Sequence, residues 1–168
     1  MHCGGRLERR VPRGDLKSRL VCTACGFVHY LNPRPVAGTV PLRRSEGRLL
    51  LVRRAIEPQS GKWVFPGGFM DVGETAEQAA CRETAEEANL EVDDLRLLGV
   101  YTRPDPGIVI VVFTARALSE ARAGHETSEV RWFLPEEIPW DELAFDSTSA
   151  ALRDLLHRGD LETAPHPS

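Results

Sequence analysis

From residue 35 onward, apolar residues gather in short runs separated by glycine, proline and charged residues, which is typical of β-strands. Two longer stretches have helical spacing instead. The first predicted helix covers residues 76–88, between a capping box formed by Thr75 and Gln78 and a left-handed end at Asn89. The second covers residues 147–157. The predicted strands are residues 36–42, 48–53, 63–65, 95–100, 108–115 and 130–133.

The first 33 residues differ in character from the rest. They lack apolar periodicity and end in the turn-like pair Asn32-Pro33. Residues 1–34 hold seven basic and two acidic residues, a balance of +5, and the remainder has a balance of −9. We therefore expect an N-terminal segment at 1–33, an α/β domain of the α+β type at 34–160 and a tail at 161–168. The acidic body argues against nucleic acid as a partner but suits divalent cations.

The composition is that of an ordinary globular protein, with 42% hydrophobic and 27% charged residues in 168 positions. The N-terminus has no apolar run after a basic start, and no apolar stretch is long enough to cross a membrane. We therefore expect a cytoplasmic protein without membrane association. In that setting the four cysteines are expected to be reduced thiols or metal ligands rather than disulfides.

Three carboxylates stand out within the first predicted helix. Glu83, Glu86 and Glu87 are spaced i, i+3 and i+4, so they share one face and repel each other unless a cation lies among them. Mg²⁺ or Mn²⁺ would suit such oxygen ligands. A solvated helix face is the ordinary alternative. It is weakened by the adjacent glycine-rich segment from Gly67, which lets backbone approach a ligand closely.

Residues 68–90 resemble the Nudix box, which runs Gly, five residues, Glu, seven residues, Arg-Glu-aliphatic-x-Glu-Glu-x-Gly-aliphatic. Two positions depart from that pattern: Thr84 replaces an aliphatic residue and Asn89 replaces a glycine. Since Asn also tolerates a positive φ, we expect Asn89→Gly to be neutral or slightly stabilising. The matching residues are Gly68, Glu74, Arg82, Glu83, Glu86, Glu87 and Leu90.

This resemblance implies a Nudix α/β/α sandwich with a mixed sheet and a Mg²⁺-dependent hydrolase that cleaves a phosphoanhydride bond. Arg82 would orient the glutamates, and Glu74 would order the loop against the helix. In many family members a further base comes from a later loop. Glu126, and after it Glu129, is the candidate here, with a plain surface loop as the alternative. The implied metal ligands are the carboxylates of Glu83, Glu86 and Glu87 and the carbonyl of Gly67.

The pair Cys22 and Cys25 matches half of a zinc ribbon, and Cys3 resembles the end of the other half. The pattern needs a fourth thiol three residues before Cys3. Three alternatives stay open: a cysteine upstream of this sequence, a site completed by His2 or His29, or a ribbon without metal.

A ribbon before a Nudix domain resembles a branch that hydrolyses NADH, FAD or ADP-ribose. The Ser-Gln-Pro-Trp-Pro-Phe-Pro stretch of the NADH enzymes is absent between residues 91 and 113, so ADP-ribose or FAD is the expected small-molecule partner. Phe69, Tyr101 and Phe145 are candidate platforms for its ring system. The resemblance also implies a homodimer. The competing hypothesis is a ligand sensor or nucleic-acid-binding regulator on a Nudix fold, which the complete set of box carboxylates disfavours.

Overall fold

The structure of the protein is a computed structural model, which describes residues 3–161. The chain divides between Pro33 and Arg34 into two compact units. In the part of the chain that is described, no helix combines the length and hydropathy needed to span a membrane.

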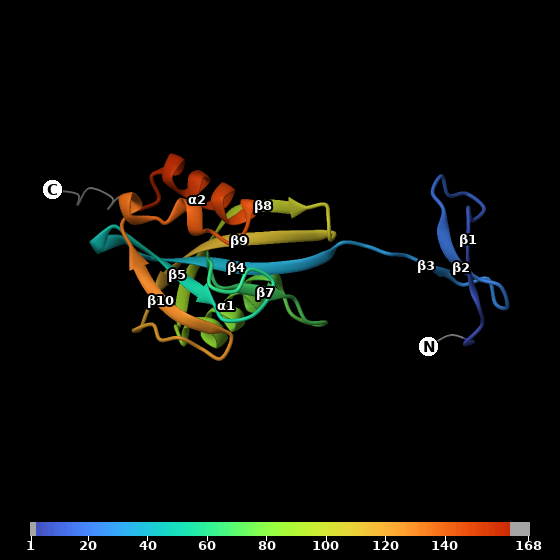
Figure 1. Cartoon of the computed structure of the whole chain (residues 1–168), viewed down its shortest axis with the longest axis horizontal. Coiled ribbons are helices and arrows are strands. Elements are labelled where there is room, and N and C mark those ends of the chain that lie inside the picture. Colours follow the sequence, from blue (N-terminus) through green and yellow to red (C-terminus); the bar gives the residue numbers. More distant parts are fainter. Residues whose placement is uncertain (1–2, 162–168) are drawn as a thin grey trace. The chain divides into compact units, whose positions relative to one another are not determined.

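The N-terminal unit is a small antiparallel sheet (Figure 1). Its strands are β1 (Leu7–Arg10), β2 (Arg19–Cys22) and β3 (Val28–His29), in the order β1-β2-β3. Val21 and Cys22 are buried, whereas all of β1 is exposed. With so little apolar surface to bury, these strands have no alternating pattern, which explains why the sequence did not predict them.

The second unit is built on one mixed sheet. Within residues 34–161, five strands follow the order β10-β5-β4-β9-β8, and two short strands pair beside them, β6 with β5 and β7 with β4. Only the pair β4–β9 is parallel. The strands are β4 (Arg34–Arg43), β5 (Arg48–Arg54), β6 (Trp63–Val64), β7 (Gly67–Phe69), β8 (Val92–Arg103), β9 (Ile108–Ala117) and β10 (Thr127–Phe133).

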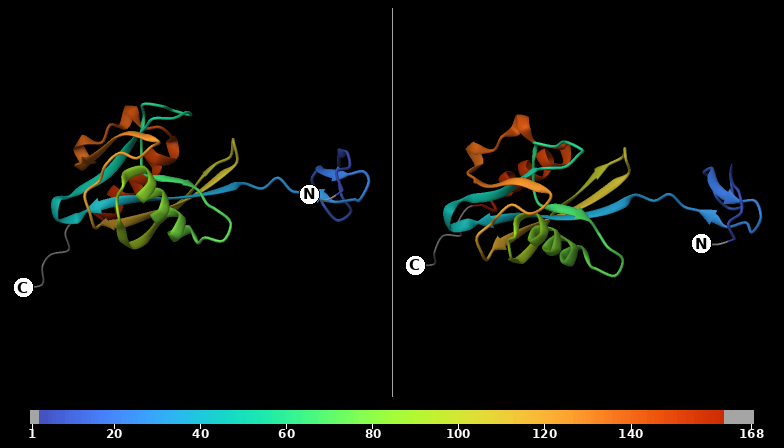
Figure 2. Two further views of the ribbon diagram at one scale, coloured as in Figure 1. Left: turned by 90° about the horizontal axis from the view of Figure 1, so that it is seen from below. Right: turned by 60° about the horizontal axis from the view of Figure 1, so that its bottom comes forward.

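Helices α1 (Ala76–Ala88) and α2 (Asp146–Arg158) lie on opposite faces of this sheet, as the two views in Figure 2 show. Strand β5 supplies both cores because its side chains alternate. Leu49 and Leu51 join the cluster that contains α2, and Leu50 and Val52 join a cluster that contains the end of α1. This sandwich confirms the predicted fold class. Short 3₁₀ helices at Arg44–Glu46, Pro135–Glu137 and Trp140–Glu142 complete the connections.

The helix α1 has the predicted ends. Thr75 and Gln78 form a reciprocal capping box, and Asn89 takes a left-handed conformation with φ 45°. Opposite the glutamates, the helix spacing predicts a packing face of Cys81, Thr84, Ala85 and Ala88, and this prediction was wrong in part: Ala85 is exposed and Cys81 only half-buried. The face that meets the sheet is formed by Ala80, Thr84, Glu87 and Ala88, so one of the three carboxylates is buried with it.

Candidate active site

A cavity of about 900 Å³ opens between the N-terminal end of β4, the strand β7 and the helix α1. One part of its wall is acidic, and contains Asp71, Glu83, Glu86, Glu87 and Glu126. Another part carries arginines and aromatic rings. Every residue of the wall belongs to the second unit.

The side chain of Arg82 forms hydrogen bonds with several carboxylates in and next to the acidic wall. Its guanidinium donates to both oxygens of Glu74 at 2.8 and 3.1 Å, to Glu83 at 2.7 Å and to Glu86 at 3.2 Å. A further bond of 3.1 Å reaches the carbonyl of Phe69 in β7. The Arg82 contacts and the Asp71 amide hold the pKa of Glu74 below its usual value. Arg82 therefore contacts the glutamates that the resemblance expects it to orient, and that role stays a prediction.

Glu87 is the most deeply buried of the three box carboxylates, with 8% of its surface exposed. Burial raises its pKa to about 7. The charges of Glu83 and Glu126 also raise it, against the Gly67 amide and Arg54, which lower it. Gly67 donates its N–H to Glu87 at 2.9 Å. The carboxylate therefore sits in a position where its charge lacks full compensation.

The carboxylate of Glu83 also has a raised pKa. Burial is the largest cause, the charges of Glu86 and Glu126 add to it, and Arg82 lowers the pKa in part. Its carboxylate lies directly over Gly68, where an added Cβ would come within 2.5 Å of it. A side chain at this position would have to displace the Glu83 carboxylate, which gives a physical reason for the glycine at the start of the box.

The loop before β10 brings Glu126 to the same wall. In Figure 2 this orange segment passes beside the green helix α1. Arg122 donates its N–H to Ala88 at 2.8 Å, and Gly124 donates to Glu87 at 3.0 Å, so the loop caps carbonyls at the end of the helix. Glu126 lines the cavity, whereas Glu129 does not line it and pairs with Arg53 at 3.5 Å. The sequence favoured Glu126 over Glu129, and the cavity wall contains Glu126 and not Glu129 because of this loop contact.

Three arginines form the basic part of the wall, and sequence reasoning missed all of them. Arg34 begins β4, Arg54 ends β5 and Arg103 ends β8. Register brings two of them together, because Arg34 and Arg103 both pair with Ile108. None of the three forms an ion pair in the described part of the chain. No signal in the sequence alone marks them, since their meeting depends on strand order.

Two of the aromatic residues predicted as stacking platforms line the cavity, and each lies against one of these arginines. Arg34 lies 4.3 Å from the ring centre of Phe69, and Arg103 lies 4.2 Å from that of Phe145. The third platform, Tyr101, is not in the cavity wall. Its hydroxyl donates to Asp154 of α2 at 2.7 Å, and its ring packs on the apolar cluster that contains residues of α2. We therefore remove Tyr101 from the candidate set.

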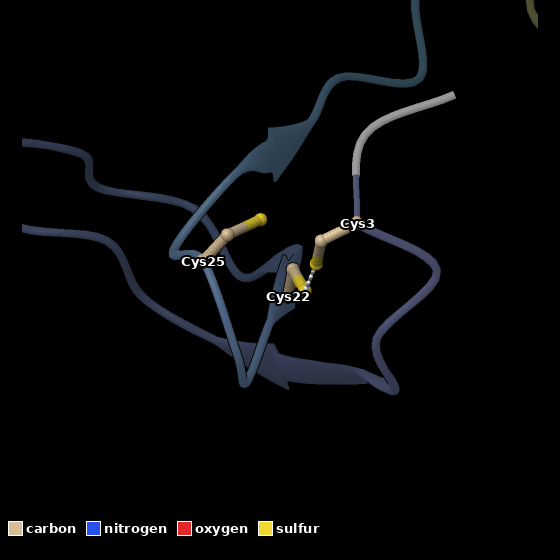
Figure 3. Close-up of side chains that lie close together, drawn as sticks. All are labelled: Cys3, Cys22 and Cys25. Atoms are coloured by element: carbon tan, nitrogen blue, oxygen red, sulfur yellow. Dashed lines mark hydrogen bonds between the residues drawn. The ribbon is translucent and has the colours of Figure 1, made fainter.

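The N-terminal unit has a separate cluster of thiols (Figure 3). The sulfur atoms of Cys3, Cys22 and Cys25 all lie within 4.8 Å of one another, with Cys3 and Cys22 only 3.4 Å apart. Backbone amides of Cys25 and Ala24 lower the pKa of Cys22 to about 7. His29 is not in this group, and His2 lies outside the described residues. Among residues 3–161 this is the only set of three such ligand atoms gathered so closely; the carboxylates of α1 are further apart.

Comparison with known families agrees with this geometry. The family model for the NUDIX domain matches residues 32–155, and a zinc-ribbon model described as Nudix N-terminal matches residues 1–31. The chain belongs to the Nudix hydrolase family. The branch predicted from the ribbon is confirmed as well, and with it the prediction of a hydrolytic enzyme.

Individual relatives support the same grouping. A NUDIX hydrolase from Nitrosomonas europaea has a similar structure, with 40% identity, a TM-score of 0.86 and coverage of 98% of this chain and 94% of that one. An ADP-ribose pyrophosphatase from Methanocaldococcus jannaschii is 35% identical over 70% of each chain. The NAD-capped RNA hydrolase NudC from Vibrio vulnificus is 29% identical over 82% of this chain, which spans only 51% of that protein.

Proposed function

We propose that this Nudix protein is a Mg²⁺-dependent hydrolase that cleaves the phosphoanhydride bond of a nucleoside diphosphate linked to a second moiety, with ADP-ribose or FAD as the best candidates. The observation that carries this proposal is the division of one cavity into an acidic wall and an arginine–aromatic wall. A volume of about 900 Å³ is within the range of sites for ligands of this size.

The acidic wall fits a divalent cation in its donor chemistry. Glu83 and Glu87 are carboxylates whose raised pKa reflects burial and neighbouring negative charge, so a cation among them would relieve a cost that the fold already carries. Glu83, Glu86 and Glu87, with the carbonyl of Gly67, would hold the ion. When bound, Mg²⁺ or Mn²⁺ would neutralise charge on the phosphoryl oxygens and make a nearby water more acidic.

The remaining residues suit the other needs of the reaction. Water attacks phosphorus, the anhydride P–O bond breaks, and a nucleoside monophosphate leaves. Glu126 is our candidate to accept the proton of the attacking water, since it lines the cavity and its charge acts on Glu83 and Glu87. Arg82 orients the glutamates through its bonds to Glu83 and Glu86.

The arginine–aromatic wall suits the nucleotide itself. Arg34, Arg54 and Arg103 offer planar donors without carboxylate partners, which fits phosphate oxygens, and the rings of Phe69 and Phe145 fit stacking on a base or flavin. The relative named ADP-ribose pyrophosphatase favours ADP-ribose within this class.

We also infer that Cys3, Cys22 and Cys25 hold a structural Zn²⁺ in the N-terminal unit. Three sulfurs within 4.8 Å of one another, and a Cys22 thiol with a pKa near 7, suit thiolate coordination.

A substrate panel with paired variants tests the assignment of the cavity. The panel contains ADP-ribose, FAD, NADH, diadenosine polyphosphates and nucleotide sugars, each with Mg²⁺. We expect Phe145→Leu to raise KM for the preferred substrate by roughly tenfold, which corresponds to the stacking of one ring. Tyr101→Phe is the matched control, because it changes an aromatic residue outside the cavity. Equal effects of the two variants, or no hydrolysis of any member, would contradict the proposal.

A further inference from the structure

Asn89 makes contacts that the residue usual at this position in the motif cannot make. It follows the last turn of α1 in a left-handed conformation, with φ 45°. Its side-chain Nδ2 donates to the carbonyls of Arg122 and Ala123, at 3.2 and 3.1 Å. A glycine would accept the same backbone conformation and would form neither bond. The replacement of glycine by Asn89 therefore adds a link between α1 and the loop before β10.

The same loop is tied to the helix at several neighbouring points. The carbonyl of Glu87 accepts from the Gly124 amide at 3.0 Å and from the Thr127 hydroxyl at 2.7 Å. Gly124 lies so close to α1 that an added Cβ would overlap the carbonyl oxygen of Glu86. On the other side, Ala55 donates its N–H to the carbonyl of Glu126 at 2.9 Å. The segment that contains Glu126 is thus hydrogen-bonded on one side to the end of α1 and on the other to Ala55, the residue after β5.

We propose that Asn89 is a positioning residue, which holds the loop so that the carboxylate of Glu126 stays beside Glu83 and Glu87. Asn89 supplies both side-chain bonds that reach the loop upstream of Gly124 from the helix end. The anchored carbonyls lie three and four residues before Glu126, and Glu87 and Asn89 are two residues apart. The end of α1 therefore contains Glu87 itself and also, through Asn89, fixes the position of the loop that contains Glu126.

This inference rests on the proposed function only where it concerns turnover. If Glu126 accepts a proton in the reaction, loosening its loop lowers kcat, since small displacements of catalytic groups cost up to about 10²-fold. The remaining backbone bonds keep the loop near the helix, so the loss should be partial. We expect Asn89→Gly to lower kcat by roughly 5- to 20-fold, with KM changed less than about twofold.

A double-mutant cycle separates this role from a general structural one. In a Glu126→Gln background, Asn89→Gly should lower kcat by less than about twofold, because the group it positions has already lost its function. The matched control is Asp94→Gly, which also changes a residue with positive φ to glycine, at φ 48°. Asn89 lies in the cavity wall, and Asp94 lies outside it. Asp94→Gly should leave kcat unchanged. Equal losses from Asn89→Gly in both backgrounds would overturn the proposal, as would a fully active Glu126→Gln protein.

Amide hydrogen exchange tests the anchor without any substrate. We expect the amides of Arg122 and Gly124 to exchange at least tenfold faster in Asn89→Gly than in the wild type. Unchanged protection would overturn the proposal. A wild-type protein that hydrolyses nothing in the panel would instead refute the proposed function, and the exchange experiment would still decide whether Asn89 anchors the loop.

Discussion

A buried hydrogen bond between two hydroxyl groups links α1 to the sheet, and its direction predicts how substitutions change the free energy of unfolding. The hydroxyl oxygens of Thr39 on β4 and Thr84 on α1 are 2.7 Å apart, and both residues are fully buried. Thr84 donates its only hydroxyl proton to the carbonyl of Ala80 at 2.7 Å. Thr39 must therefore be the donor to Thr84. This direction makes the two threonines unequal.

Replacing Thr84 with valine, which matches the aliphatic residue of the motif, leaves the Thr39 hydroxyl buried without an acceptor. An unsatisfied buried donor costs about 1–3 kcal/mol, so we expect the free energy of unfolding to fall by about 2 kcal/mol. Thr39→Val removes the donor instead and should cost about 1 kcal/mol or less. With both changed to valine, no donor is stranded, and stability should return to within about 0.5 kcal/mol of the wild type.

Urea unfolding of the four proteins, followed by far-ultraviolet circular dichroism, measures this cycle. The prediction is a coupling energy of at least about 1.5 kcal/mol in favour of the double variant. Singles that add to give the double, or a Thr84→Val protein as stable as the wild type, would refute the assigned direction of the bond. Turnover of the double variant should stay near normal, because neither hydroxyl lines the cavity.

Three further predictions follow from the sites. Burial raises the pKa of Glu87 to about 7, from 4.5 in the unfolded chain, so ionisation of this carboxyl destabilises the metal-free fold as pH rises. The unfolding free energy of the wild type should thus drop relative to Glu87→Gln by roughly 2 kcal/mol between pH 5 and pH 8; a flat difference would contradict this. Arg82→Lys should lower kcat at least roughly tenfold, because an ammonium cannot span Glu74, Glu83 and the Phe69 carbonyl; near-normal turnover would argue against that clamp. Cys25→Ser should reduce zinc, measured by elemental analysis, from about one ion per chain to almost none, with kcat unchanged; a wild type without zinc would refute the ribbon site.

Local signals predicted the helix that holds the candidate metal ligands. The helix α1 has the expected limits, because its capping box and the left-handed Asn89 are encoded within one stretch of chain. The ends of the strands were predicted less accurately. Strand β8 begins at Val92 rather than at residue 95, because this edge strand extends beyond the apolar run from which it was predicted. Strand β7 was missed because its glycines carry no apolar pattern and its pairing with β4 is a long-range contact.

The parts of the site that depend on tertiary contacts could not be predicted. Arg34 and Arg103 meet through strand register, and Tyr101 is hydrogen-bonded to Asp154 of α2 instead of lining the cavity. The expected neutrality of Asn89→Gly rested on backbone conformation alone. The two side-chain bonds of Asn89 change that expectation, because glycine keeps the turn and loses the link to the loop.

One measurement tests directly whether the carboxylates of α1 are required for hydrolysis. Release of mononucleotide from ADP-ribose or FAD is followed with Mg²⁺ for the wild type, for Glu86→Gln and for Glu77→Gln. Glu77 is the matched control, a glutamate in the first turn of the same helix that does not line the cavity. We predict turnover by the wild type, a loss of at least about 10²-fold in Glu86→Gln with an unchanged unfolding midpoint, and normal turnover in Glu77→Gln. Near-normal turnover by Glu86→Gln at saturating Mg²⁺ would show that these carboxylates are not required for hydrolysis.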